Sequence, residues 1–174
     1  MNQEFAEQKE KNGFEKLKEF NNAVFKLKEL GQTPPKHWSD ASGITTNEQY
    51  INFELKIRNQ TLDMKNMIVS GINSTSKNVY TANTIYIEMH KVGSLLLDYN
   101  ILDYQPLYVN FLNNAVVIFN LSKLNKVPNT IARRIYSTLF QGFEMAKRVE
   151  LPLTEAYIYI KDENNEYKLV YKPR

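Results

Sequence analysis

Residues 107–121, LYVNFLNNAVVIFNL, decide the fold class, because the same letters fit a helix and a β-hairpin. A helix would stack five side chains on one face: Tyr108, Phe111, Leu112, Ala115 and Phe119. A hairpin would place an apolar run on either side of Asn113-Asn114, and Asn tolerates the positive φ that a tight turn needs. The apolar pattern continues through Leu121 and Leu124, which favours the helix and leaves the hairpin as the alternative.

Apolar residues at spacings of three and four also predict a helix over residues 4–30. Its inner face would consist of Phe14, Leu17, Phe20, Val24, Leu27 and Leu30. Gly31 follows as a C-cap, and Pro34-Pro35 forbids continuation. The first dozen residues offer little apolar surface besides Phe5, so we expect that part to pack on a partner as an arm.

Three further segments have helical patterns. Residues 45–72 carry a capping-box spacing in Thr45 and Glu48, and Gly71 closes the segment. Residues 84–100 fit a helix, although TIYIEM alone also fits a strand. Residues 127–152 repeat apolar side chains at helical spacing and end at Pro152.

The C-terminal segment is expected to be a β-hairpin. Residues 155–173, EAYIYIKDENNEYKLVYKP, alternate apolar and polar side chains on both sides of the turn sequence DENNE. The predicted fold is therefore α+β and mainly α: a helical bundle of about four to five helices with a C-terminal β-hairpin. We expect a single domain over 1–174, with an N-terminal helix or arm at 1–30, a helical core at 45–152 and the hairpin at 155–173.

Composition excludes several kinds of chemistry. The chain has no Cys, and its two histidines, His37 and His90, show no metal-ligand spacing. Its six glycines form no phosphate-binding loop, and acid pairs such as Asp98 with Asp103 are expected to be solvated. No apolar run is long enough to span a membrane, and the charged N-terminus is not typical of a signal peptide. We therefore expect no enzyme activity, no cofactor, no metal, no small-molecule substrate and no membrane association.

The segment 34–43, PPKHWSDASG, holds the only tryptophan. His37, Ser39 and Asp40 are residue types of a catalytic triad, but such close neighbours do not usually reach the relay geometry. We therefore expect a turn between two helices. Trp38 would bury its ring between them, and Trp38→Ala would cost about 3–5 kcal/mol.

Nucleic-acid contact is an alternative function. The net charge is only +3, from 22 Lys and Arg against 19 Asp and Glu, so charge permits this role without indicating it. Two groups of cations beside tyrosines are the candidate nucleic-acid contacts: Arg133 and Arg134, and Lys168, Lys172 and Arg174 in the tail.

Protein–protein contact is the favoured function. Tyr is enriched at interfaces, and the candidate partner-binding residues are Tyr157, Tyr159, Tyr167, Tyr171 and Phe5. Because catalytic motifs are lacking and Asn and Tyr are abundant, as AT-rich coding DNA would produce, we expect a phage virion component. It would be an auxiliary capsid or head–tail connector subunit, in a homo-oligomer or a larger assembly. The alternatives are an accessory nucleic-acid-binding protein of a phage or plasmid and an inhibitor of a host defence enzyme. The expected location is the virion or the cytoplasm of an infected bacterial cell.

Overall fold

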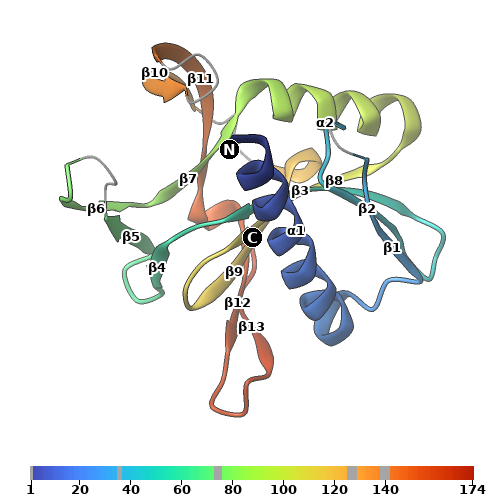
Figure 1. Ribbon diagram of the computed structural model, residues 1–174. Coiled ribbons are helices and arrows are strands. Elements are labelled where there is room, and N and C mark those ends of the chain that lie inside the picture. Colours follow the sequence, from blue (N-terminus) through green and yellow to red (C-terminus); the bar gives the residue numbers. More distant parts are fainter. Residues whose placement is uncertain (1, 35–36, 73–75, 125–128, 138–141) are drawn as a thin grey trace.

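The computed structural model describes residues 2–34, 37–72, 76–124, 129–137 and 142–174. In these ranges the protein is mainly β, with thirteen strands in three sheets and two α-helices (Figure 1). The largest sheet has seven strands in the order β1-β2-β3-β8-β9-β12-β13. Their bounds are β1 Glu29–Gln32, β2 Ala41–Ile44, β3 Tyr50–Ile57, β8 Gln105–Phe111, β9 Ala115–Asn120, β12 Tyr157–Lys161 and β13 Tyr167–Tyr171.

Two small sheets and two helices complete the fold. Strands β4 (Gln60–Asp63), β5 (Ile68–Ile72) and β6 (Val79–Ala82) form one small sheet. Strands β10 (Asn129–Ser137), β11 (Gly142–Pro152) and β7 (Thr84–Glu88) form the other, in that order. The helices are α1 (Asn2–Phe20) and α2 (Met89–Leu102), and short helical turns follow at Asn21–Phe25, Leu121–Lys123 and Leu153–Glu155.

The seven-stranded sheet has one parallel pair. β3 runs parallel to β8, with Ile51 opposite Gln105, whereas its other neighbouring strands are antiparallel. Parallel strands need a crossover connection, and here the chain returns through the β4–β6 sheet, β7 and α2.

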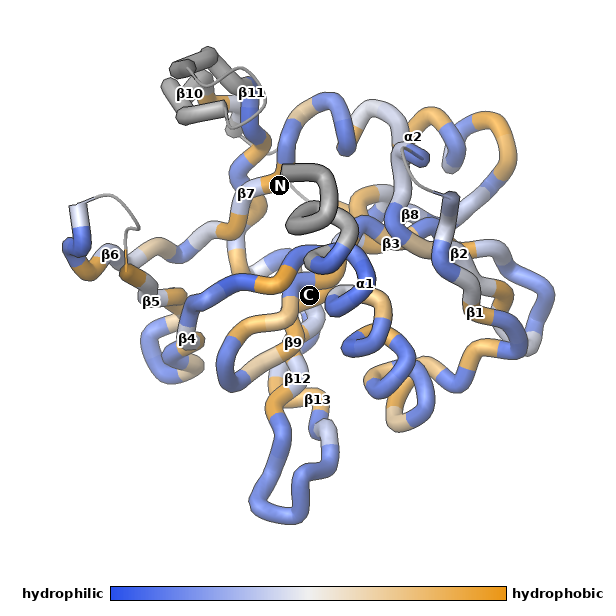
Figure 2. Tube along the Cα trace, in the orientation of Figure 1, coloured by the Kyte–Doolittle hydropathy of each residue, from blue (hydrophilic) through white to orange (hydrophobic). Residues whose placement is uncertain are grey.

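The two helices cover opposite faces of this sheet. Leu17 and Phe20 of α1 pack in one core with Ile51, Phe53 and Leu55 of β3. Leu95 of α2 belongs to a second core on the other face, which also contains side chains of β7, β8, β9, β11 and β12. Strands β8 and β9 therefore lie between two buried layers, and the orange of apolar residues runs along much of them in Figure 2.

This double burial explains why the helix prediction for residues 107–121 is wrong. The segment is a hairpin of β8 and β9, and the Leu112 N–H donates to the Ala115 carbonyl at 2.8 Å across the turn. A strand buried on both faces is apolar at nearly every position, so it also fulfils the helical spacings. Because both faces are buried, β8 and β9 lack the alternation of apolar and polar residues that would have identified them as strands.

The helical-bundle prediction is wrong elsewhere too. Residues 45–72 form β3, β4 and β5, and the predicted helix at 127–152 falls on β10 and β11, with 127–128 and 138–141 outside the described residues. The helix prediction for 84–100 is wrong for TIYIE, which is strand β7, and correct from Met89, where the helix begins. A helical core at 45–152 is therefore excluded, and a mainly β core takes its place.

The N-terminal helix ends ten residues before the predicted Leu30. Its last turn widens at Asn21–Phe25, where Lys26 adopts a left-handed φ of 51° and its N–H donates to the Asn21 carbonyl at 2.7 Å. The Asn21 Oδ1 also accepts the Leu27 N–H at 2.9 Å. The chain then enters β1, so Gly31 lies in a strand instead of capping a helix.

The predicted C-terminal hairpin is present as β12 and β13. It extends the large sheet, because β12 also pairs with β9. The loop between its strands is hydrophilic and projects from the body of the molecule (Figures 1 and 2).

Candidate active site

The candidate site lies where β3 extends beyond β2. The first residue of β2, Ala41, pairs with Phe53, so residues 54–57 of β3 have no partner on that edge. Because side chains alternate along a strand, Asn52, Glu54 and Lys56 point away from the α1 side, towards the face that α2 covers. This stretch of β3 therefore presents polar groups on a face that β8 and β9 fill with apolar ones.

Glu54 is the central residue of this site. Its side chain is 0% exposed, and its Oε2 accepts a hydrogen bond from Lys91 Nζ at 2.8 Å. Its Oε1 has no hydrogen-bond partner, and Lys56 Nζ lies 3.5 Å from it. Burial raises the pKa of Glu54, the negative charge of Asp40 raises it further, and the two lysines only partly offset this effect. A buried polar atom without a hydrogen-bond partner calls for an explanation, and carboxylates with shifted pKa values cluster at functional sites.

Asp40 brings a second carboxylate to the same place. It immediately precedes β2, and its backbone N–H donates to the Phe53 carbonyl at 2.8 Å. Its Oδ2 accepts the Leu55 N–H at 2.7 Å, which belongs to the unpaired edge of β3. The open edge therefore holds Asp40 beside Glu54, and the two acids remain close despite their repulsion.

Two lysines supply the opposite charge. Lys91 comes from the first turn of α2 and bonds Glu54. Lys56 lies between Glu54 and Glu88, with its Nζ 4.0 Å from Glu88 Oε2. Burial lowers the pKa of Lys56, but the charges of Glu54, Glu88 and Asp40 outweigh burial and the net direction is upward. Lys56 is therefore an ammonium ion at neutral pH.

These groups line a cavity of about 420 Å³ at the open edge of β3, where the first turn of α2 lies on one face of the sheet and α1 on the other. Glu10, Asn12 and Gly13 of α1 form its remaining wall with Leu55 and Ile57. In the described ranges, no group of three or more His, Asp and Glu side chains is placed to hold a metal ion. Two carboxylates suffice for Mg²⁺, which keeps several waters and completes its shell with substrate phosphates. The residue types of this cavity therefore suit Mg²⁺ better than a closed zinc centre, which takes Cys and His ligands.

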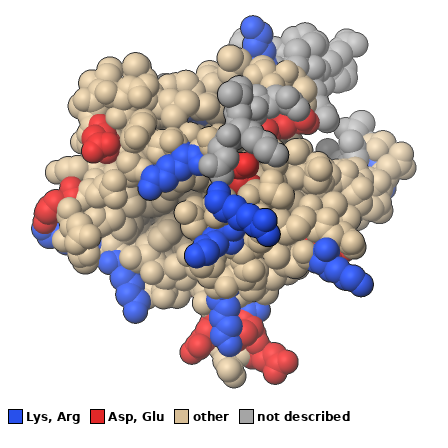
Figure 3. All heavy atoms as spheres, turned by 180° about the vertical axis from the view of Figure 1, so that it is seen from behind, with Lys and Arg blue, Asp and Glu red and all other residues tan. Residues whose placement is uncertain are grey.

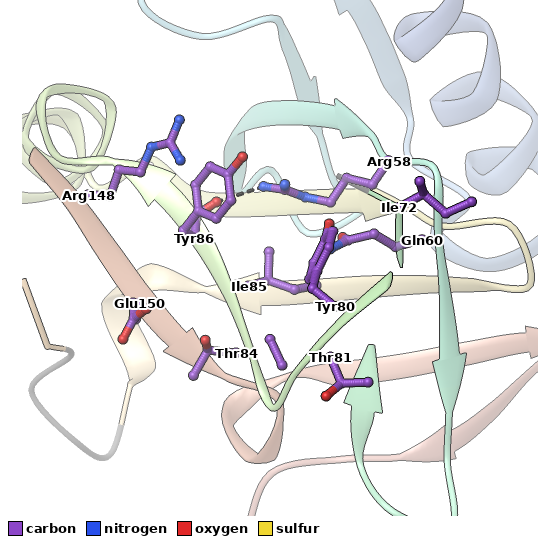
Figure 4. Close-up of a pocket in the computed structure, with 11 residues that line it drawn as sticks. Arg58, Gln60, Ile72, Tyr80, Thr81, Thr84, Ile85, Tyr86, Arg148 and Glu150 are labelled. Atoms are coloured by element: carbon purple, nitrogen blue, oxygen red, sulfur yellow. Dashed lines mark hydrogen bonds between the residues drawn. The ribbon is translucent and has the colours of Figure 1, made fainter. Parts of the chain in front are cut away.

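A second cavity of about 500 Å³ is lined by Arg58, the residue that follows β3 (Figure 4). Arg58 follows Lys56 by two residues and is held by Asn110 Oδ1 at 2.7 Å and by Tyr108 Oη at 2.6 Å. The Tyr86 ring lies between the guanidinium groups of Arg58 and Arg148, whose Cζ atoms are 4.6 and 4.0 Å from its centroid. Arg148 Nε is buried without a hydrogen-bond partner. Two arginines in one hollow can bind an anion such as phosphate.

Figure 3 shows how charged side chains are distributed over one face of the molecule. Seen from the side opposite Figure 1, several Lys and Arg side chains gather near the middle of the molecule, and many Asp and Glu side chains lie nearer its margins and on the projecting hairpin (Figure 3).

The 34–43 corner differs from its prediction. Trp38 is 45% exposed instead of buried, because the helix that was expected to cover it is strand β3. Its Nε1–H finds its acceptor in Asp98 Oδ2 at 2.7 Å. Asp98 is 9% exposed, so the expectation that it is solvated is wrong.

The three triad-like residues do not form a relay. His37 Nδ1 lies 2.9 Å from Ser39 Oγ, and the same Nδ1 accepts the Ser39 backbone N–H at 3.2 Å. Asp40 is turned towards the Leu55 N–H. The triad is therefore not assembled, although Asp40 belongs to the site described above.

The predicted partner-binding tyrosines lie at the other end of the large sheet. Tyr159 and Tyr167 pack edge-on against Phe20 at 5.1 and 4.9 Å, and the Tyr171 hydroxyl donates to the Thr154 carbonyl at 3.3 Å. Tyr157 is the most open of the four, at 37% exposure. The backbone of Phe5 lies in α1, and its side chain lies outside the described part of the structure. Their partner-binding role stays a prediction.

The predicted nucleic-acid residues are spread over two sheets. Lys168 pairs with Asp162 at 2.6 Å on the projecting hairpin, and Lys172 and Arg174 follow β13 in the exposed tail. Arg133 and Arg134 lie on β10, and their side chains are outside the described residues. The structure does not bring Lys168, Lys172 or Arg174 to the candidate site, because β13 and β3 are separated by three strands.

Sequence reasoning missed Glu54, Lys56, Lys91 and Arg58. A usable signal existed in YINFELKI, where charged residues alternate with large apolar ones at the spacing of a strand. When the segment is predicted to be a helix, the same charged residues are assigned to its solvated face and indicate no site.

Comparison with family models, curated proteins and solved structures finds no match to this chain. Among the described residues, no helix is long and apolar enough to cross a membrane.

Proposed function

We propose that this protein is a Mg²⁺-dependent nuclease that hydrolyses a phosphodiester bond at the open end of β3. The observation that carries the proposal is that Asp40 and the fully buried Glu54 line one cavity with two lysines, and that Glu54 Oε1 has no hydrogen-bond partner and only Lys56 Nζ at 3.5 Å. Acids in this arrangement bind Mg²⁺, and cations next to them bind phosphate.

Asp40 and Glu54 have the role of metal ligands in the proposed hydrolysis. Asp40 and Glu54 would hold the ion, which supplies charge stabilisation at phosphate and lowers the pKa of a bound water. The attacking water would lose a proton to solvent as its oxygen forms a bond to phosphorus and the bond from phosphorus to a sugar oxygen breaks. The leaving sugar oxygen would take up a proton from solvent, so the products are a phosphomonoester and a hydroxyl.

Lys56 contributes positive charge where the phosphate becomes more negative. Since its pKa is raised, it remains protonated and stabilises the transition state instead of acting as a base. Lys91 positions Glu54 through the 2.8 Å contact to Oε2, and Oε1, which has no hydrogen-bond partner, would contact the ion. Arg58 and Arg148 offer anion contacts beyond the cleaved bond, which suits a polymer with several phosphates.

A cleavage assay tests this function. Purified protein is incubated with labelled single-stranded and duplex DNA and RNA, with Mg²⁺ or with EDTA. We expect Mg²⁺-dependent cleavage that Asp40→Asn and Glu54→Gln abolish, whereas the matched control Glu163→Gln, in the exposed hairpin loop, cleaves like the wild type. Cleavage that survives both substitutions, or a wild type that neither cleaves nor binds Mg²⁺ in calorimetry, would overturn the proposal.

The assembly role and its virion location stay untested predictions. The virion location rests on composition and on the lack of catalytic motifs. The contact role rests on aromatic surface, and Tyr159 and Tyr167 use much of theirs against Phe20. The cavity that holds Asp40 and the buried Glu54 gives hydrolysis the stronger structural basis.

A further inference from the structure

Trp38 is a large apolar ring that the fold leaves open to solvent. Its 45% exposure corresponds to roughly 100 Å² of surface. It is the only tryptophan of the chain. Scattered exposed apolar residues are common, so exposure alone indicates nothing.

The way in which Trp38 is held distinguishes it from such residues. Its Nε1–H donates to Asp98 Oδ2 at 2.7 Å, and the same oxygen accepts Asn52 Nδ2 at 2.6 Å. Asp98 and Asn52 are buried, at 9% and 3% exposure. The His37 ring stacks on the indole with 3.9 Å between centroids and 29° between planes. A buried carboxylate and a stacked ring therefore fix the orientation of an aromatic surface that remains accessible.

Trp38 lies next to the candidate active site. It precedes Asp40 by two residues, and its carbonyl oxygen lies 3.5 Å from Lys91 Nζ. Lys91 also bonds Glu54, and Asn52 precedes Glu54 by two residues on the same face of β3. Trp38 and the carboxylates of Asp40 and Glu54 are thus held in place by some of the same residues.

We propose that Trp38 stacks an unpaired nucleobase next to the phosphodiester bond that the site cleaves; this inference rests on the proposed nuclease function. An aromatic face binds any base by stacking, and a cation beside it tracks the phosphate. Within a duplex both faces of each base are covered by neighbours, so the ring can act only on a base that is single-stranded or displaced. The substrate class is therefore nucleic acid with unpaired nucleotides at the cleavage point: a single strand, a flap or a fork.

Fluorescence of Trp38 tests this directly, because no other tryptophan contributes to the signal. Glu54→Gln protein, which cannot cleave, is titrated in Mg²⁺ with a single-stranded DNA oligonucleotide, with the same sequence as a blunt duplex, and with the RNA version. We expect quenching by the single strands and little by the duplex. In a separate anisotropy titration with a labelled oligonucleotide, Trp38→Ala should weaken single-strand binding about 5- to 100-fold, whereas Trp38→Phe should retain most of the affinity.

The outcomes separate this inference from the function on which it rests. Single-strand binding without any change in Trp38 emission, or a Trp38→Ala variant with wild-type affinity and wild-type preference for single strands, would overturn the stacking role. If cleavage still requires Asp40 and Glu54 in that case, the nuclease function stands alone. If Trp38 is quenched but no substrate is cleaved, stacking stands and hydrolysis fails. Circular dichroism of the variants excludes unfolding as the cause of weak binding.

Discussion

Replacement of Glu54 by Gln should abolish activity without weakening the fold. Burial and the charge of Asp40 raise the pKa of Glu54, so the folded protein disfavours the charged form of this residue. Gln has the same shape and no charge, and its side chain can still accept the Lys91 hydrogen bond that Glu54 Oε2 accepts at 2.8 Å. The substitution removes an unfavourable charge from the folded state and at the same time removes a proposed ligand of Mg²⁺.

Two opposing effects determine how much Glu54→Gln changes the free energy of unfolding. Breaking a buried ion pair costs about 3–5 kcal/mol when the remaining charge is left without compensation. Lys91 is 22% exposed and its Nζ also reaches the Trp38 carbonyl, so water and this carbonyl compensate it. The removed desolvation and repulsion act in the other direction and dominate, as the raised pKa shows. We expect Glu54→Gln to equal or exceed the wild type in free energy of unfolding at neutral pH, by up to about 1 kcal/mol.

The pH dependence has a defined sign. Since the folded pKa of Glu54 lies above its unfolded value, the charged form destabilises the fold fully above the folded pKa. This destabilisation disappears as the pH falls through the folded pKa towards the unfolded one. The advantage of Glu54→Gln over the wild type should therefore shrink as the pH is lowered from neutral.

Urea unfolding in EDTA at neutral and acidic pH measures both effects. Cleavage assays in Mg²⁺ should show a loss of at least 10³-fold, about 4 kcal/mol of transition-state stabilisation. Added Mg²⁺ should raise the melting temperature of the wild type and leave the variant unchanged. A loss of more than about 3 kcal/mol in unfolding free energy would make Glu54 a structural ion pair and would refute the reasoning.

Three more substitutions test other parts of the structure. Lys56→Met should lower kcat about 10²- to 10³-fold without weakening Mg²⁺ binding in calorimetry, because it removes a positive charge near the ion; weaker Mg²⁺ binding would contradict its assigned role. Tyr108→Phe should cost about 1–2 kcal/mol in urea unfolding, because the fully buried hydroxyl accepts a 2.6 Å hydrogen bond from Arg58, and a neutral result would contradict this. Gly43→Ala should cost about 1–3 kcal/mol, because a Cβ would lie 2.7 Å from Leu27 Cδ1; an unchanged melting temperature would show that Leu27 moves aside freely.

The terminal elements could be predicted from the sequence better than the centre. The alternation around DENNE correctly indicated the hairpin of β12 and β13, since one side of that hairpin is solvated. Phe14, Leu17 and Phe20 correctly indicated α1, whose outer face is polar. In both elements one side is buried and the other is solvated. The apolar residues therefore recur at a regular spacing that can be recognised in the sequence.

The central strands lack that contrast. β8 and β9 are buried on both faces, so their letters alone do not distinguish a strand from a helix. In β3, Asn52 and Glu54 are buried polar residues, which an amphipathic reading places on the solvent side. The site was missed for the same reason, because Asp40 and Glu54 become neighbours only once β2 and β3 are recognised as strands.

The parallel pairing of β3 with β8 also sets the order of events in folding. Ile51 meets Gln105, so a long segment must be in place before this ladder can close. Such a closure has a large entropic cost, and pairings with high contact order form slowly. A chain still leaving the ribosome has made Asp40, Glu54 and Lys56 well before it has made β8. Incomplete chains therefore contain the acids and the lysine without the docked α2 that completes the cavity.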